Sequence, residues 1–174
     1  MVDAMIPARA REDFTLVSLA APHGGGGLLA ARIGEQLGLA LPPPGRWSAA
    51  GGFTALCTTP GQWLVMRDGD DGALYDRLRA VVQEAGTLID LSASRVAVRV
   101  SGERARAALA TLLPLDLHPR AMQAGCAAAT LAAHLPVLVR QIDDTPAYEL
   151  MCARSFAGSF HRALHLAGMR IAPA

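Results

Sequence analysis

The sequence predicts an α+β fold with mainly antiparallel sheets, built from two related halves. Strand-like segments alternate with amphipathic helical segments, and the order strand, helix, hairpin, helix occurs twice, at about residues 14–86 and 87–170. In addition, Thr59-Pro-Gly-Gln-Trp-Leu-Val-Met66 before one helix parallels Thr145-Pro-Ala-Tyr-Glu-Leu-Met151 before another. Their offset of about 85 residues is far longer than a solenoid repeat. Hairpins followed by helices favour sheets that carry their helices on one face.

The first half begins with a strand over residues 14–20, and Gly24–Gly27 forms a flexible lead into a helix whose apolar positions recur at i, i+4 and i+8. Residues 53–58 and 62–66 are predicted to form a hairpin turned by Thr-Pro-Gly. The Asp-Gly-Asp-Asp-Gly run at 68–72 then ends the strand and caps a second helix. The apolar face of that helix consists of Leu74, Leu78, Val81, Val82 and Ala85.

The second half begins with two strands, at residues 88–92 and 96–100, joined by a Leu-Ser-Ala-Ser turn. An ion pair between Asp90 and Arg95 is expected across this turn. Ser101-Gly102 starts a helix, whose inward positions are predicted to be Ala105, Ala108, Leu109 and Leu112.

Residues 127–142 predict two more strands, with the turn near Leu135-Pro136, and residues 148–152 predict another strand. A final helix is expected to bury Phe156, Phe160, Ala163, Leu164 and Ala167. The 174 residues are therefore expected to form a single domain over 14–170, preceded by a flexible N-terminus at 1–13.

The composition excludes several classes of function. The formal net charge is +1, which gives no electrostatic field to attract nucleic acid or an anionic membrane. All 16 basic residues are arginine, because the chain contains no lysine. This excludes Schiff-base catalysis and the phosphate-binding lysine of a P-loop. Cys57, Cys126 and Cys152 are widely spaced, which favours reduced thiols in a cytoplasmic protein over disulfides or a zinc site.

Three patterns resemble functional motifs but lack a required partner. The glycines after His23 lack the Gly-x-Ser-x-Gly elbow that an esterase needs. His161 and His165 lie at helical i, i+4 spacing, without a glutamate base or an evident third metal ligand. The acidic run at 68–72 would place Arg79 at the bidentate position of a calcium loop. We therefore expect a flexible loop, a solvated helix face and a helix cap, and we assign no catalytic, cofactor-binding or metal-binding residue.

The run Leu113-Pro-Leu-Asp-Leu-His-Pro-Arg120 is the strongest candidate for a functional element. Asp116, His118 and Arg120 bring a carboxylate, an imidazole and an arginine fork within five residues. One interpretation is a polar recognition loop stiffened by proline. The alternative is a turn that Asp116 and Arg120 close by pairing with each other or with solvent.

These residues carry a family resemblance. Ile89-Asp-Leu-Ser-Ala-Ser-Arg-Val-Ala-Val-Arg-Val-Ser-Gly102 and Pro114-Leu-Asp-Leu-His-Pro-Arg120, extended by Arg154-Ser-Phe-Ala157, resemble the gamma subunit of heterotetrameric sarcosine oxidase. The chain is also similar, more distantly, to the folate-binding aminomethyltransferases, which implies an aminomethyltransferase-like domain. In those enzymes a hairpin carries an aspartate that assists transfer to tetrahydrofolate. Here Thr130-Leu-Ala-Ala-His-Leu-Pro-Val-Leu138 crosses the equivalent place without a carboxylate.

The resemblance implies a structural or assembly subunit without catalytic residues. The complex would demethylate sarcosine oxidatively to glycine and pass the one-carbon unit to tetrahydrofolate. Its FAD, FMN, NAD, folate and zinc would lie on large flavin- and NAD-binding subunits and a small zinc-binding subunit. Asp116, His118 and Arg120 would then be docking residues for a partner. The alternatives are a stand-alone folate-binding protein of the aminomethyltransferase type and a self-associating scaffold.

Overall fold

A computed structural model of the chain describes residues 6–69 and 73–173. The chain divides into two compact units, although the sequence predicts a single domain. Unit 1 combines residues 1–12 with 94–174, and unit 2 comprises residues 13–93. The sequence predicts a boundary between the halves near residue 87, whereas unit 2 continues to residue 93. The strand at 87–90 pairs in the sheet of unit 2 and therefore belongs to that unit.

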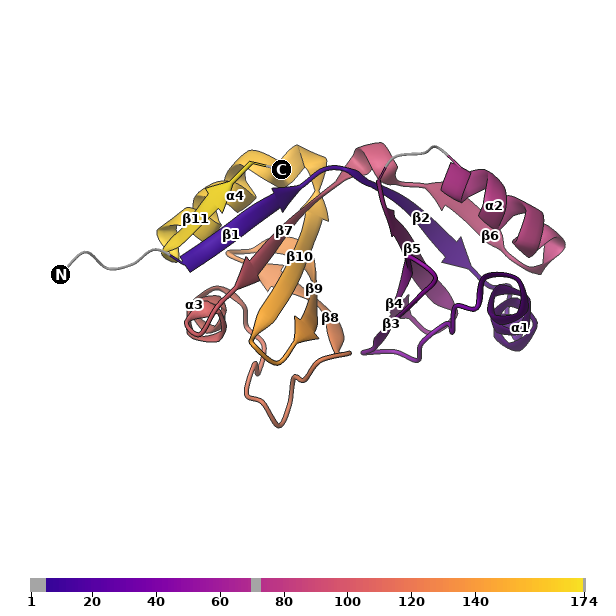
Figure 1. Cartoon of the computed structure of the whole chain (residues 1–174), viewed down its shortest axis with the longest axis horizontal. Coiled ribbons are helices and arrows are strands. Elements are labelled where there is room, and N and C mark those ends of the chain that lie inside the picture. The colour runs from indigo at the N-terminus through magenta and orange to yellow at the C-terminus, as the bar shows by residue number, and fades with distance from the viewer. Residues whose placement is uncertain (1–5, 70–72, 174) are drawn as a thin grey trace. The chain divides into compact units, whose positions relative to one another are not determined.

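Unit 2 contains a five-stranded antiparallel sheet and two helices (Figure 1). The order across the sheet is β3-β4-β5-β2-β6. In chain order its elements are β2 (Phe14–Ala20), α1 (Gly26–Leu37), β3 (Trp47–Ala50), β4 (Phe53–Thr59), β5 (Gln62–Asp68), α2 (Ala73–Val82), the 3-10 turn η1 (Gln83–Ala85) and β6 (Thr87–Asp90).

Unit 1 contains a six-stranded sheet in the order β11-β1-β7-β10-β9-β8, in which only the β1–β11 pair is parallel. In chain order its elements are β1 (Ile6–Arg11), β7 (Arg95–Ser101), α3 (Ala105–Leu112), β8 (Ala127–Ala132), β9 (Leu135–Asp143), β10 (Ala147–Ala153), the 3-10 turn η3 (Arg154–Phe156), α4 (Ala157–Leu166) and β11 (Met169–Ala172). A further 3-10 turn, η2 (Ser92–Ser94), precedes β7.

The two sheets share one topology. Each unit follows the order strand, helix, three antiparallel strands, helix, strand, and each sheet places the middle strands in the same sequence beside the first strand. Unit 1 differs by one insertion, since β1 lies between β7 and β11 whereas the equivalent strands β2 and β6 pair directly. The predicted mainly antiparallel α+β fold with two related halves is confirmed.

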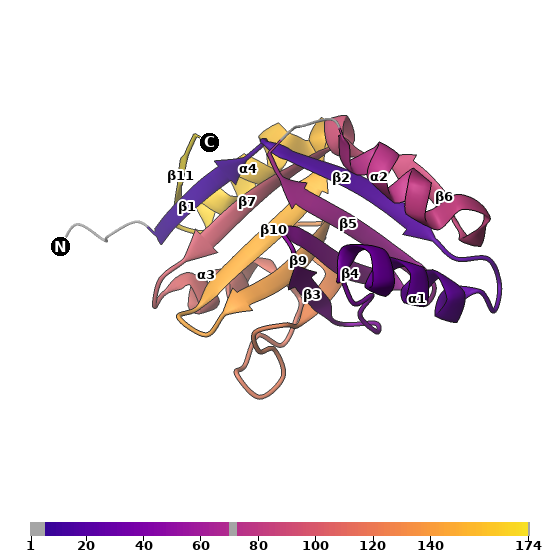
Figure 2. The ribbon, with the colours of Figure 1, turned by 45° about the vertical axis from the view of Figure 1, so that its right-hand side comes forward.

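In each unit the two helices cover one face of the sheet, as Figures 1 and 2 show. The predicted apolar faces mostly become the core. Leu29 and Ile33 of α1 pack with Leu74, Leu78 and Val82 of α2 in unit 2. In unit 1 the buried helical residues are Ala105, Ala108 and Leu109 of α3 and Phe160 and Leu164 of α4. Phe156 is an exception, because it lies exposed in η3 before α4 begins.

Equivalent aromatic residues occupy the start of the central strand that follows each hairpin. Trp63 on β5 and Tyr148 on β10 both face the helix-covered core of their own unit. The Trp63 indole N–H donates to the carbonyl of Pro42 at 2.8 Å, in the segment between α1 and β3. In both units the Thr-Pro pattern therefore precedes a buried aromatic residue at the equivalent strand position. The contacts of that aromatic residue differ between the two units.

The predicted flexible N-terminus is wrong for residues 6–11, which form β1. Ile6, Ala8 and Ala10 alternate with exposed or partly exposed residues, and Ala8 lies opposite Val100 of β7. A short strand with small apolar residues and a proline gives only a weak sequence signal for β structure. Pairing with distant strands therefore determines that residues 6–11 form β1. Residues 1–5 lie outside the described part of the chain.

Two further expectations need correction. Asp90 and Arg95 do not flank a hairpin, because β6 and β7 belong to different sheets. Instead, the Asp90 carboxylate accepts hydrogen bonds from the Ser92 N–H at 2.9 Å and the Ser92 hydroxyl at 2.7 Å, which lower the pKa of Asp90. The β8–β9 turn is formed by Ala133 and His134, both with positive φ, and Pro136 lies within β9.

None of the described helices is long and apolar enough to cross a membrane.

A buried ionic cluster joins three strands of unit 1. Glu149 of β10 has 2% of its side chain exposed and pairs with Arg11 of β1 and with Arg140 of β9 at 2.8 Å. The Nε–H of Arg140 also donates to the same carboxylate at 2.9 Å. Burial lowers the pKa of Arg140, and the Glu149 carboxylate opposes that shift. One carboxylate thus stabilises the charge of two buried guanidinium groups.

We predict that Glu149→Ala lowers the free energy of unfolding by about 3–5 kcal/mol, because it leaves buried arginine charges without their carboxylate. Urea denaturation followed by circular dichroism measures this change. Glu103→Ala is the matched control, since Glu103 is exposed and exposed substitutions usually change stability by at most about 0.5 kcal/mol. Equal stability of the two variants would show that the cluster does not stabilise unit 1.

Candidate functional site

The candidate site is the loop of residues 113–126, which joins α3 to β8 in unit 1 and lies at the lower edge of Figure 1. Its backbone is fixed by apolar residues that point into the core of the unit. Leu113, Leu117 and Met122 are each 3% exposed and belong to the same hydrophobic cluster as Tyr148. Burial of three side chains within one loop holds the polar residues between them in defined positions.

Arg106 of α3 links the loop to the sheet. Its guanidinium group donates to the carbonyl oxygen of Leu117 and approaches the carbonyl oxygen of Met122 at 3.5 Å. The same group lies 5.7 Å from the centre of the Tyr148 ring, within the range of a cation–π contact. Arg106 therefore hydrogen-bonds the backbone at two of the three apolar anchors of the loop, Leu117 and Met122.

Local hydrogen bonds shape the segment that presents the predicted residues. The Asp116 carboxylate accepts from the backbone N–H of His118 at 2.8 Å, an Asx turn. The His118 carbonyl accepts from the N–H groups of Ala121 and Met122 at 2.8 and 2.9 Å. The N–H of Arg120 donates to the imidazole Nδ1 of His118 at 3.2 Å. The turn is therefore closed by side-chain-to-backbone and backbone hydrogen bonds.

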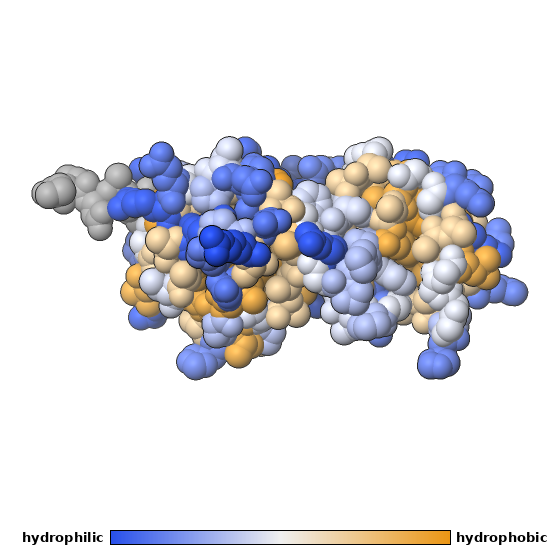
Figure 3. Space-filling model, turned by 90° about the horizontal axis from the view of Figure 1, so that it is seen from below, coloured by the Kyte–Doolittle hydropathy of each residue, from blue (hydrophilic) through white to orange (hydrophobic). Residues whose placement is uncertain are grey.

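The structure brings Asp116, His118 and Arg120 together on one exposed turn. Within the described residues Asp116 and Arg120 form no ion pair with each other, so of the two pairings in the alternative only pairing with solvent fits the structure. The Arg120 guanidinium and the outer nitrogen of His118 are directed to solvent rather than used in folding. Figure 3 shows that strongly hydrophilic side chains stand beside apolar ones on the face that includes the lower edge of Figure 1.

Other sequence candidates lie apart from this loop. His161 and His165 occur on α4, and no group of three potential metal ligands exists among residues 6–69 and 73–173. Asp68 ends β5, whereas Asp70 and Asp71 lie outside the described residues. His23 is exposed in the turn before α1. The three cysteines are free thiols, and burial raises the pKa of Cys152 to about 11. A protonated, buried thiol is a poor nucleophile.

A match to a family of known proteins covers residues 24–169, and the family is the sarcosine oxidase, gamma subunit family. The chain belongs to this family. Its relatives include the sarcosine oxidase subunit gamma of an Arthrobacter species, which is 34% identical over 76% of this chain and 60% of the relative. The same subunit of Corynebacterium sp. strain P-1 is 31% identical over 78% of this chain and 67% of the relative.

Solved structures show the same fold. A chain of the heterotetrameric sarcosine oxidase from Corynebacterium sp. U-96, solved with pyrrole 2-carboxylate, superposes with a TM-score of 0.81 at 29% identity. That match covers 92% of this chain and 82% of the other. The glycine cleavage system aminomethyltransferase T of Bartonella henselae gives 0.69 at 15% identity, covering 98% of this chain and 48% of that enzyme. The aminomethyltransferase-like fold is thereby confirmed.

The β8–β9 hairpin of this gamma-family chain does not fit a folate-transfer site of the aminomethyltransferase type. Residues 127–142 contain no carboxylate, and the turn residues are Ala133 and His134. A general acid or base has to lie within hydrogen-bond reach of the proton that it moves. The hairpin supplies no such group, so we derive no transfer chemistry from this chain.

The sequence interpretation found the exposed residues of the loop but missed Arg106 and Tyr148. Arg106 lies 11 residues before Leu117, and Tyr148 comes from a strand on the far side of two hairpin turns. The only signal was the parallel between the Trp63 and Tyr148 segments, which indicated equivalent positions without indicating what they contact.

We predict that Arg106→Ala destabilises the chain by about 1–3 kcal/mol, because buried carbonyl groups lose their donor. Amide hydrogen exchange should accelerate at Ala121 and Met122, whose N–H groups depend on the turn that Arg106 supports. Arg120→Ala serves as the control and should leave both stability and exchange near wild type. Unchanged exchange in the Arg106 variant would contradict the assigned role.

Proposed function

We propose that this protein is a non-catalytic structural or assembly subunit of a sarcosine oxidase complex. The observation that carries the proposal is the preformed loop at 113–126, which presents His118 and Arg120 to solvent in a chain of the gamma subunit family. The complex would demethylate sarcosine oxidatively to glycine, with transfer of the one-carbon unit to tetrahydrofolate.

The partners follow from this proposal. They are large subunits that bind flavin, NAD and folate, and a small subunit that binds zinc, all in the cytoplasm. The loop suits a docking role because its backbone is already ordered, which lowers the entropy cost of association. Arginine can bind a carboxylate or backbone carbonyls in a fixed bidentate geometry and is enriched among interface residues that dominate binding energy.

A second candidate function is a stand-alone folate-binding protein, which the aminomethyltransferase-like fold favours. The carboxylate-free hairpin argues against it. We retain it as the outcome that ligand binding would support.

We predict that Arg120→Ala weakens assembly with the large subunits while the melting temperature of the isolated chain stays near wild type. The reason is that Arg120 is exposed and contributes no hydrogen bond from its side chain within the described residues. Co-purification from cells that express all subunits measures assembly, and differential scanning calorimetry measures melting.

Arg79→Ala is the matched control, because Arg79 is an exposed arginine on α2 of the other unit. It should change neither quantity. A large fall in melting temperature with assembly retained would mean that Arg120 stabilises the fold instead of docking a partner.

We also predict that the isolated chain is colourless and binds neither flavin nor folate. The basis is the absence of lysine to neutralise phosphate and of a carboxylate in residues 127–142. An absorption spectrum and isothermal titration calorimetry with a reduced folate provide the measurements. A saturable micromolar isotherm would favour the stand-alone folate-binding function.

A further inference from the structure

A second surface of unit 1 lies on α4 and β11, away from the 113–126 loop in the sequence. We define the α4–β11 surface by His161, Arg162, His165, Leu166 and Arg170. The segment from 154 to 173 contains three arginines and two histidines but no aspartate or glutamate. The arginines give this segment a local positive charge, although the formal net charge of the whole chain is only +1.

The arginines of this surface form no ion pair with any of the described residues. Within the described residues, Arg162, His165 and Arg170 form no side-chain hydrogen bond or ion pair. The nearby carboxylate of Glu12 lies 3.8 Å from Arg154, so it is directed to a different arginine. Among the described residues, Glu12 supplies the one carboxylate that lines the larger hollow beside these cations, so further carboxylates supplied by a partner would stabilise the remaining positive charge.

Two hollows flank α4. The larger, of about 970 Å³, lies between α4 and the β1–β11 edge and is lined by the arginines and histidines of the surface together with Ala10, Glu12 and Ile171. The smaller, of about 370 Å³, lies between α4 and α3 and is lined by Leu112, Arg162 and Leu166. Leu166 is 78% exposed, the highest value among the large apolar residues of the described chain. Together with Leu112, Leu166 gives the smaller hollow an apolar wall that an apolar side chain of a partner could cover.

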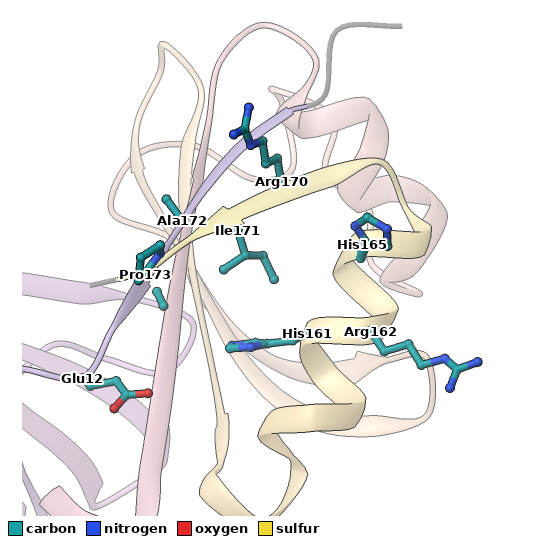
Figure 4. Close-up of a pocket in the computed structure, with 9 residues that line it drawn as sticks. Glu12, His161, Arg162, His165, Arg170, Ile171, Ala172 and Pro173 are labelled. Atoms are coloured by element: carbon teal, nitrogen blue, oxygen red, sulfur yellow. The ribbon is translucent and has the colours of Figure 1, made fainter.

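The orientation of the side chains distinguishes a small ligand from a protein partner. In Figure 4 His161 points toward the strands and Ile171, whereas Arg162 and Arg170 extend away in different directions. A small anion would need guanidinium groups that converge on one point. Cations spread around an apolar hollow instead match several separate carboxylates along an extended segment.

We propose that the α4–β11 surface docks an acidic segment of a partner protein, with an apolar side chain of that segment seated beside Leu166 and carboxylates facing Arg162, Arg170 and the two histidines. This inference rests on the proposed assembly function and adds a second contact to that of the 113–126 loop. The partner is defined by its chemistry: a surface strand or helix that carries aspartates or glutamates around one large apolar residue.

The test measures binding of the full-length chain to the remainder of the complex, purified without it. We expect the double variant Arg162→Glu/Arg170→Glu to raise the dissociation constant by about tenfold or more, and the wild-type affinity to fall as salt is added. Leu166→Ser should also weaken binding, without the change in salt dependence. Arg79→Glu on α2 is the matched charge control and should bind like wild type, and melting temperatures should show that all variants fold.

The outcomes separate the two proposals. If wild type fails to bind the remainder of the complex, the assembly function itself is wrong. If wild type binds and both sets of α4–β11 variants bind equally well, the assembly function stands and this surface is not the contact. Calorimetry with inorganic phosphate and with citrate provides the last check: saturable binding by the isolated chain that the double variant loses would overturn the protein-partner proposal in favour of a small-anion site.

Discussion

The buried carboxylate of Glu149 is the constraint on which the architecture of unit 1 depends. A carboxylate removed from water has to be paired, and here its partners come from β1 and β9, on either side of the two central strands. Arg11 can reach it only when β1 lies in its observed register against β7. Because β11 pairs with β1, the placement of the N-terminal strand also positions the last strand of the sheet. The larger hollow of the α4–β11 surface includes Ala10 of β1, so the ionic cluster helps to position one of its walls.

The two units show how one topology supports different surfaces. In unit 2 the segment after the first helix is short, and the Trp63 indole closes it directly by donating to Pro42. In unit 1 the equivalent segment is longer, at 113–126, and the smaller Tyr148 ring leaves room for a guanidinium group above it. Arg106 takes the donor role that the indole has in unit 2, and it reaches carbonyl groups further along the chain. The same arrangement of helices and strands therefore carries a short connecting segment in unit 2 and a longer polar loop in unit 1.

Much of this fold could be predicted from the sequence, because the spacing of apolar residues within each element is a local signal. Helical spacing identified most of the apolar face of each of the four helices, and the Thr-Pro-Gly turn identified the β4–β5 hairpin. The strands that were missed, at 6–11, 47–50 and 169–172, are short or rich in alanine and arginine. The strands at 6–11 and 169–172 pair with partners far away in the chain, whereas 47–50 pairs with the adjacent strand β4 across Gly51 and Gly52. Nothing local distinguishes the two terminal strands from flexible ends, whereas Gly51-Gly52 after residue 50 is a local hairpin signal that the sequence interpretation did not use. The ion pair predicted between Asp90 and Arg95 was wrong for a related reason, because sequence neighbours in strands need not share a sheet.

The candidate loop could be recognised from its exposed residues, but what makes it a rigid surface could not. Prolines and an Asx-forming aspartate are local signals, whereas the contact of Arg106 with Tyr148 depends on packing between α3 and β10. Rigidity matters for the proposed role because an ordered loop gives up little conformational entropy on binding. The α4–β11 surface is built in the same way: its cations lie on a helix and a strand that are held by the core, through Phe160, Leu164 and Met169. Under the proposed assembly function, the chain would contribute to a complex through surfaces of fixed shape and charge, and our proposals place two such surfaces on unit 1.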